Sequence, residues 1–166
     1  MANSVYLDAS ALAKRYVPEK GSPHVHALLD AVPADRLYLL NVGAGEVVSI
    51  LVRKRNAGVI SAAYFGQALV DLESEILRAA DINKLSVTNR LAASSIPLIV
   101  DHSINSTDAV TLKSALAIAR KLRAGGGDLV LVASDQRLLR AAQAEGLSTF
   151  DPESQDQAAL AGFVGP

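Results

Sequence analysis

Short apolar runs recur along the chain, and longer stretches with helical spacing separate them. The runs 5–7, 37–40 and 129–132 are apolar throughout, and 147–150 is a less apolar, β-prone run that ends in Phe150. Apolar residues at every position, instead of at alternate positions, are typical of parallel strands that helices cover on both faces. These runs therefore predict the buried strands of a parallel sheet.

The stretches between the runs have apolar residues three and four positions apart, as in Leu69, Leu72 and Ile76. This is the spacing of an amphipathic helix. Three glycines at 125–127 mark a clear helix end. The predicted helices cover 10–16, 24–32, 43–54, 61–80, 88–104 with a kink at Pro97, 106 up to those glycines, and 136–144.

Strands that alternate with helices in this way predict an α/β fold, a three-layer α/β/α sandwich with a central, mostly parallel sheet. No internal repeat or long linker interrupts the pattern, so we expect one domain over residues 1–152. The segment 153–166 is rich in Gln and Ala and is a weakly specified C-terminal tail.

Composition narrows the chemistry. The 166 residues include 16 Lys and Arg against 17 Asp and Glu, a net charge of −1, and no cysteine. Without cysteine, disulfide scaffolds, zinc–thiolate sites, iron–sulfur clusters and thiol catalysis are excluded. Any metal must therefore be held by oxygen or imidazole. Near-neutral charge also argues against a protein that coats nucleic acid by charge alone.

Membrane segments and targeting signals are not predicted. The longest uncharged run, 56–70, contains Gly58 and Gly66 together with polar residues, whereas a spanning helix needs about 20 mostly apolar residues. The N-terminus has no basic region ahead of an apolar stretch. We therefore expect a cytoplasmic protein that does not contact membranes.

Four acidic residues lie where strands end or helices begin. Asp8 ends the first strand, Asp135 follows the run 129–132, and Glu46 lies in the first turn after the second strand. Strand ends and the following helix starts share one edge of a parallel sheet, where ligands bind in open α/β folds. We therefore expect these three to lie close together. Asp108 joins them only if its helix begins at the same edge.

Each acid alone is explained equally well by helix capping, because a carboxylate near a helix N-terminus stabilises it by about 0.3–1 kcal/mol. A cluster is different, since neighbouring carboxylates repel and raise one another's pKa unless a positive charge lies between them. No Lys or Arg stands at the first position of these helices. An all-oxygen set of this kind suits Mg²⁺ or Mn²⁺.

Several segments resemble a known family. The opening 5–22, with Asp8, then Ser10-Ala11-Leu12, then Tyr16-Val17-Pro18, resembles the start of PIN-domain proteins of the VapC toxin type. The resemblance extends over nearly the whole chain to Pro152, although 58–104 contributes little. It continues through Gly45-Glu46-Val47, Thr107-Asp108-Ala109-Val110-Thr111-Leu112 and Leu131-Val132-Ala133-Ser134-Asp135-Gln136-Arg137-Leu138-Leu139.

The resemblance implies a metal-dependent endoribonuclease that hydrolyses RNA phosphodiester bonds and is the toxin of a type II toxin–antitoxin pair. It implies Mg²⁺ or Mn²⁺ held by Asp8 as the central ligand and Asp108 as the second principal ligand. Glu46 and Asp135 would complete the site directly or through water. It also implies a cognate antitoxin and a homodimer.

Two positions depart from the family pattern. Ala133 stands where the family has Thr or Ser, with Ser134 adjacent, and Lys113 replaces a small residue. Because a hydroxyl that orients a ligand is missing or displaced, one alternative is a PIN-fold binding module with weak or no catalysis that acts through protein or RNA contacts. Another is a phosphoacceptor domain using Asp8, although phosphatases of that kind have a second Asp where this chain has Ser10.

The remaining polar features have structural interpretations beside functional ones. Ser10 either caps its helix or orients Asp8. His24 and His26, with only His102 elsewhere, are surface or cap residues and do not predict a zinc site. The basic groups 53–55 and 120–123 match the dipole at helix ends, and they would contact phosphates if they lay near the acidic edge.

Overall fold

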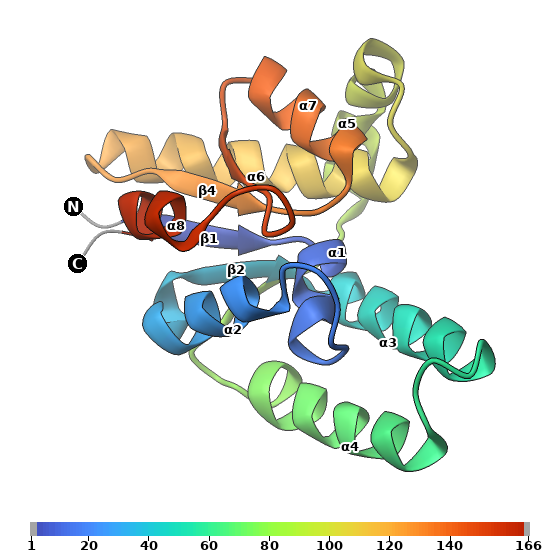
Figure 1. Ribbon diagram of the computed structural model, residues 1–166. Coiled ribbons are helices and arrows are strands. Elements are labelled where there is room, and N and C mark those ends of the chain that lie inside the picture. The colour runs from blue at the N-terminus through green and yellow to red at the C-terminus, as the bar shows by residue number, and fades with distance from the viewer. Residues whose placement is uncertain (1–2, 165–166) are drawn as a thin grey trace.

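The computed structural model describes residues 3–164, and within them five strands form one fully parallel sheet (Figure 1). The strand order is β3-β2-β1-β4-β5, so the first strand of the chain is central. Tyr6 of β1 lies opposite Tyr38 of β2 and Leu131 of β4. The strands are β1 Ser4–Leu7, β2 Leu37–Leu40, β3 Asn83–Leu85, β4 Leu129–Val132 and β5 Ser148–Phe150.

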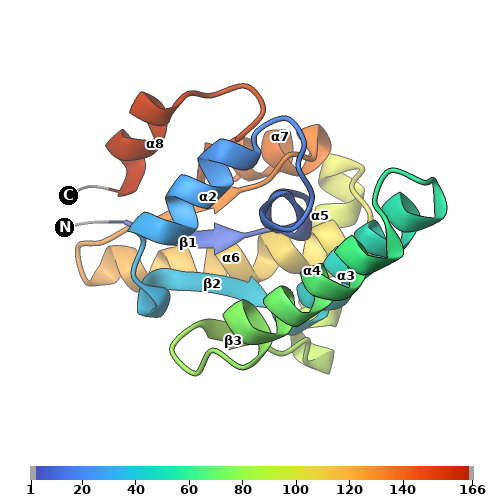
Figure 2. The same ribbon diagram turned by 60° about the horizontal axis from the view of Figure 1, so that its bottom comes forward.

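Helices cover both faces of the sheet, as the apolar strands predict (Figures 1 and 2). Among the helices that the structure describes, none has the length and apolar character needed to cross a membrane. They are α1 Ala9–Leu12, η1 Ala13–Arg15, α2 Ser22–Ala31, η2 Ala34–Arg36, α3 Asn41–Asn56, α4 Ala62–Leu72, η3 Glu73–Leu77, α5 Asn89–His102, α6 Ser106–Ala124, α7 Gln136–Ala144 and α8 Gln157–Val164.

Two apolar cores hold the three layers together, one on each side of the sheet. Val5 and Leu7 of β1 point into the core formed with α1, α2, α3 and α4, whereas Tyr6 between them points into the core formed with α5, α6 and α7. All three strand residues are at most 2% exposed. The three-layer α/β/α sandwich with a central parallel sheet is therefore confirmed.

The structure differs from the predicted elements where local pattern is weak. The strand β3 (Asn83–Leu85) lies at the edge, is half-buried, and pairs only with β2 among the described strands. Its sequence Asn-Lys-Leu lacks the apolar run by which the other strands are recognised. The helix predicted over 61–80 becomes a π turn at Glu73–Leu77 and ends there.

The segment after Glu153, which the sequence specifies weakly, contains α8. Leu160 of this helix is 2% exposed and packs into the core beside α2. Phe163 makes an edge-to-face contact with Phe150 of β5, with ring centroids 6.4 Å apart. Leu160 and Phe163 stand in an Ala-rich stretch with no clear helical periodicity, so this packing is evident only in the structure.

Candidate active site

The four acids singled out in the sequence line one cavity of about 430 Å³. Each comes from a different part of the fold: Asp8 follows β1, Glu46 lies on α3, Asp108 lies in the first turn of α6, and Asp135 precedes α7. The cavity lies at the carboxyl ends of β1 and β4. The helix α6 does begin at this edge, so Asp108 joins the other three.

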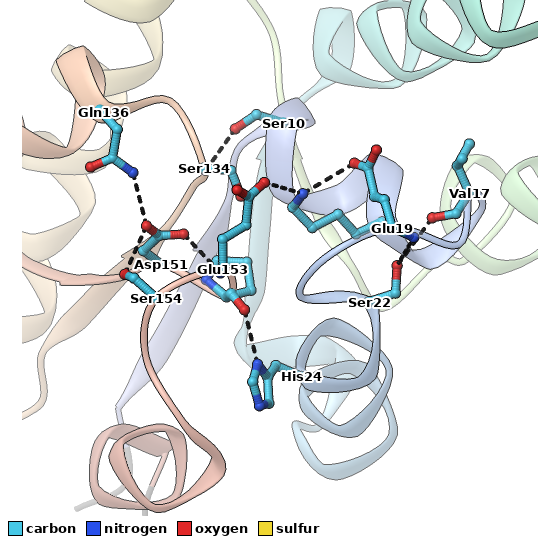
Figure 3. A network of polar contacts seen from close by, with 12 residues as sticks. Ser10, Val17, Glu19, Ser22, His24, Ser134, Gln136, Asp151, Glu153 and Ser154 are labelled. Carbon is cyan, nitrogen blue, oxygen red and sulfur yellow. Dashed lines mark hydrogen bonds and ion pairs between the residues drawn. The ribbon is translucent and has the colours of Figure 1, made fainter. Parts of the chain in front are cut away.

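Asp8 is buried and held by Ser10. The Ser10 hydroxyl donates to Asp8 Oδ2 over 2.5 Å, and the Ser10 backbone N–H donates to the same oxygen over 2.9 Å. Ser10 Oγ also accepts a hydrogen bond of 2.9 Å from the backbone N–H of Ser134, which Figure 3 shows. Of the two roles open to Ser10, the structure shows the orienting one, because its hydroxyl fixes the Asp8 carboxylate against the end of β4. The residue that caps α1 is Asp8, whose carboxylate accepts from the Ser10 backbone N–H.

Asp108 is positioned by Asn105, a residue that the sequence analysis did not single out. Asn105 caps α6: its Oδ1 accepts from the Asp108 backbone N–H over 2.8 Å, and its Nδ2 donates to Asp108 Oδ2 over 2.7 Å. An Asn three residues ahead of an acid at a helix start is a recognisable capping pattern. It is the signal that could have identified this residue.

Asp135 caps α7 as well as lining the cavity. Its Oδ1 accepts hydrogen bonds from the backbone N–H groups of Arg137 and Leu138, at 2.8 and 3.2 Å. Capping and membership of the acidic cavity are therefore compatible for this residue, as they are for Asp8. Glu46 has no capping contact in the structure described and points into the cavity from the first half of α3.

The cavity destabilises the ionised form of its carboxylates. Burial, and then the charges of Asp8, Asp135 and Glu46, raise the pKa of Asp108 to about 7. Burial also raises the pKa of Asp8 in spite of the hydrogen bonds from Ser10, with Asp135 contributing. Burial and the charge of Asp8 raise the pKa of Glu46. At neutral pH this arrangement favours any ligand that brings positive charge.

Cations in the protein do not offset this charge. Within residues 3–164, none of the four acids forms an ion pair. Arg53 is the one basic residue in the described cavity lining, and its guanidinium has no ion-pair or hydrogen-bond partner among the described residues. Arg137 lies near enough to lower the pKa of Asp108, but this effect is outweighed. Arg53 is thus placed at the acidic edge with its charge free for an anionic ligand.

The donor set suits a hard divalent cation in kind, because it consists of carboxylate oxygens. In the part of the chain that the structure describes, however, no three His, Cys, Asp or Glu side chains converge closely enough to form a ready-made metal site. The carboxylates share a cavity wall without meeting at one point. The residues therefore match Mg²⁺ or Mn²⁺ in the kind of donor atom and in charge, but the described side chains do not form a metal site as they stand.

The residues flanking the last acid differ from the family pattern in a specific way. Ala133 is fully buried, and the Ser134 hydroxyl is buried with no hydrogen-bond partner in the structure described. Ser134 is not part of the cavity lining, and its backbone N–H is what reaches Ser10. The hydroxyl that the family pattern places beside the last acid is therefore not part of the described cavity lining.

The histidines lie elsewhere. His24 Nδ1 is 2.9 Å from the carbonyl oxygen of Pro152, and His26 contacts Arg15. His102 Nε2 is 2.7 Å from Glu145 Oε1. Each histidine thus has its own structural partner, on a different part of the fold.

No protein-family model and no curated protein matches the chain. Solved structures do share its fold. A FitAB complex bound to an IR36 DNA fragment matches with a TM-score of 0.64 at 16% identity, over 92% of this chain and 98% of that chain. PAE2754 from Pyrobaculum aerophilum matches with a TM-score of 0.60 at 21% identity, over 93% and 94%.

VapC20 from Mycobacterium tuberculosis, described as a sarcin–ricin loop cleaving toxin, matches with a TM-score of 0.61 at 18% identity, over 92% of this chain and all of that chain. These likenesses extend over almost the entire domain. The chain therefore shares the fold of these solved structures, as the resemblance seen in the sequence predicts.

Proposed function

We propose that the protein is a metal-dependent endoribonuclease that hydrolyses RNA phosphodiester bonds, and that it is the toxin of a type II toxin–antitoxin pair. One observation carries the proposal: four carboxylates from four separate elements line one cavity, and the described residues offer them no ion pair. Burying like charges in this way costs stability. A fold retains such a cluster when a bound cation uses it.

The residues divide the work as follows. Asp8 and Asp108 are the principal ligands for Mg²⁺ or Mn²⁺, and Glu46 and Asp135 complete the shell directly or through water. Ser10 and Asn105 hold the two principal carboxylates in place. A bound Mg²⁺ or Mn²⁺ would lower the pKa of a coordinated water and offset negative charge on the phosphodiester.

Arg53 has a separate role in this proposal. Its guanidinium lies on the same face of α3 as Glu46, seven residues further along, and lines the cavity without a partner. An arginine placed there can hold a non-bridging phosphate oxygen of RNA and bring the backbone into a cavity that otherwise repels it. Arg53 is the substrate-orienting residue of the site.

The shared fold supports the biological setting. The neighbour VapC20 is described as a sarcin–ricin loop cleaving toxin, and the FitAB neighbour is a complex bound to a DNA fragment. We therefore also propose a cognate antitoxin protein as partner and a homodimeric state. Light scattering of the purified protein, alone and co-expressed with the product of an adjoining short reading frame, tests both assemblies.

A direct assay tests the nuclease itself. Purified protein is incubated with labelled RNA and Mg²⁺ or Mn²⁺, and parallel samples contain excess EDTA. Cleavage that requires metal, and that fails in Asp8→Asn protein, supports the proposal. Full cleavage in EDTA would overturn the metal mechanism.

A second candidate is a PIN-fold binding module with little catalysis, and Ala133 is the observation that favours it, because a hydroxyl of the family pattern is absent there. The two candidates differ in whether bound RNA is cleaved. A binding module would retain RNA or a protein partner while leaving RNA intact in millimolar Mn²⁺.

A further inference from the structure

A second polar groove, of about 400 Å³, lies on the outer face of α6, away from the acidic cavity. Three of its lining residues are basic and come from one helix: Lys113, Arg120 and Arg123. We infer that this groove binds the phosphodiester backbone of RNA at a distance from the cleavage site. The remaining lining residues are Leu98, Leu116, Ala117 and Glu145.

Lys113 gives the strongest indication, because it is half-buried and has no partner among the described residues. The other buried or half-buried lysines of that part of the chain are all engaged. Lys14 and Lys54 contact carboxylates. Lys84 donates to three backbone carbonyls. Nζ of Lys113 still reaches solvent, since it is not among the buried unpartnered atoms of the described residues. Its charge is therefore offset by no described side chain and is open to an anion in the groove.

The other charges of the groove leave room for such an anion. Arg120 is exposed and has no ion pair within residues 3–164. Arg123 is anchored by Asp128 and by the Gly146 carbonyl oxygen, at 2.8 and 2.9 Å. The acid in the lining, Glu145, is engaged by His102 at 2.7 Å. Lys113 and Arg120 are therefore the cations available to a ligand.

The spacing of these cations distinguishes a polymer from a single phosphate. Residues 113, 120 and 123 lie on one stripe of α6, and at 1.5 Å per residue the stripe is about 15 Å long. One phosphate cannot span that length, whereas successive phosphates of a nucleic-acid strand can. Leu98 and Leu116 beside the stripe offer apolar surface to the sugars.

The groove and the cavity are joined through one helix. Asp108 lies in the first turn of α6 and Lys113 follows within the next two turns. A strand held along the stripe would therefore lie about 8 to 22 Å from Asp108 along the axis of α6. The choice of RNA as the polyanion rests on the proposed function.

The test compares two double variants that remove the same charge. In Lys113→Gln/Arg120→Gln the groove loses its two available cations, whereas in Lys20→Gln/Lys121→Gln two exposed lysines outside the groove are lost. Binding of a labelled single-stranded RNA of about 12 nucleotides is followed by fluorescence anisotropy in EDTA across a range of salt concentrations. Cleavage of the same RNA with Mn²⁺ is measured separately.

The groove variant should bind RNA about tenfold more weakly at moderate salt, and the slope of log K against log salt should fall by about 1.4. Its kcat at saturating RNA should match wild type while KM rises, and Lys113→Arg should retain affinity. The Lys20/Lys121 variant should change affinity by a smaller factor.

Equal weakening in both double variants would overturn the groove while leaving the nuclease proposal intact. A mononucleotide that displaces the RNA in equimolar amounts would also overturn it, since the site would then hold a single phosphate. Wild-type protein that neither binds nor cleaves RNA would reject the proposed function and the groove together.

Discussion

Two buried clusters of charge, a short distance apart in the sequence, are built on opposite principles. The acidic cavity contains four carboxylates that form no ion pair among the described residues: Asp8, Glu46, Asp108 and Asp135. The lysine network, which consists of Lys14, Glu19, Lys54 and Glu153, pairs every charge. Lys14 Nζ lies 3.1 Å from Glu19 Oε1 and 2.5 Å from Glu153 Oε1, and Lys54 Nζ lies 2.9 Å from Glu19 Oε2.

The pKa values show the consequence. Burial alone would raise the pKa of Glu19, but the hydrogen bonds and charges of Lys54 and Lys14 outweigh it and lower that pKa. In the cavity the same burial is reinforced by like charges, and the pKa of Asp108 rises to about 7. The pKa of a buried carboxylate is therefore lowered where lysines pair with it and raised where other carboxylates surround it.

The difference separates structure from function. The lysine network joins η1 to the turn after β5, because Lys14 donates to both Glu19 and Glu153. Figure 3 shows these two glutamates beside the contacts that Asp151 makes with Gln136 and Ser154. Its charges are satisfied and need no ligand. The charge of the cavity is not offset by any described cation, and a bound proton or a ligand must relieve it, so it is the region to which chemistry is assigned.

The largest effect should come from removing a principal carboxylate. Asp8→Asn or Asp108→Asn should lower the RNA cleavage rate by more than about 100-fold, because loss of a ligand exceeds the 10–100-fold loss typical of its supporting residues. Circular dichroism should show an unchanged fold. Asp101→Asn, at an exposed position, is the matched control. Cleavage retained in both cavity variants would remove them from the mechanism.

In the lysine network the same kind of change should affect stability alone. Lys14→Met should lower the free energy of unfolding by about 2 kcal/mol, below the 3–5 kcal/mol seen when a fully buried pair is broken. The loss is smaller because Glu19 keeps Lys54, and Glu153 is 38% exposed in its side chain. Urea denaturation measures the change, and Lys20→Met is the exposed control. Loss of RNA cleavage in a folded Lys14→Met variant would contradict the prediction that the lysine network affects stability alone.

A smaller effect is expected at Ser10, which supports the cavity without being a ligand. Ser10→Ala removes the 2.5 Å hydrogen bond to Asp8 and the link to Ser134. Metal affinity and cleavage should each fall about tenfold, and Ser10→Thr should restore both because it keeps the hydroxyl. If Ser10→Thr behaved like Ser10→Ala, side-chain size rather than hydrogen bonding would be the cause.

The smallest effect concerns stability without metal, and its sign follows from the raised pKa of Asp108. The folded state binds this proton more tightly than the unfolded state, so the stabilisation is complete below the ordinary pKa of 3.8 and is lost as pH rises through about 7. In EDTA, the Tm of Asp108→Asn relative to that of wild type should therefore rise from pH 5 to pH 8. Near pH 8 its Tm should exceed that of wild type by about 3 °C or more.

Thermal melts at the two pH values measure this difference, and Asp101→Asn again provides the control. A Tm of Asp108→Asn below that of wild type near pH 8 would mean that the ionised carboxylate stabilises the metal-free cavity. The ionised cavity would then stabilise the fold, as the charges of the lysine network do, and the contrast between the two regions would not hold.

Strands buried on both sides could be predicted from the sequence, as could the edge strand β5, whereas the edge strand β3 and the helix α8 could not. The strands β1 and β4 are apolar at nearly every position because helices cover both faces. By contrast, β3 is half-buried, and its three residues have no periodicity to read. The helix α8 is held by Leu160 and Phe163, which little distinguishes from their Ala-rich surroundings.

The candidate site divides in the same way. The carboxyl-end rule for parallel strands predicts where Asp8 and Asp135 lie, because it depends only on local order along the chain. The link between Ser10 and Ser134 joins residues 124 positions apart. Lys14 and Glu153 are 139 positions apart. Such pairings depend on how layers pack, so no local pattern in one sequence reveals them.

The central claim is that the acidic cavity is incomplete without a divalent cation, and titration calorimetry with Mn²⁺ tests it most directly. Wild-type protein near pH 7 should give saturable binding whose heat changes with the ionisation enthalpy of the buffer, because the cation displaces the proton that Asp108 retains. Asp8→Asn should bind far more weakly. No binding by wild type at millimolar Mn²⁺ would contradict the account, and would favour a PIN-fold module that binds its partners without cutting RNA.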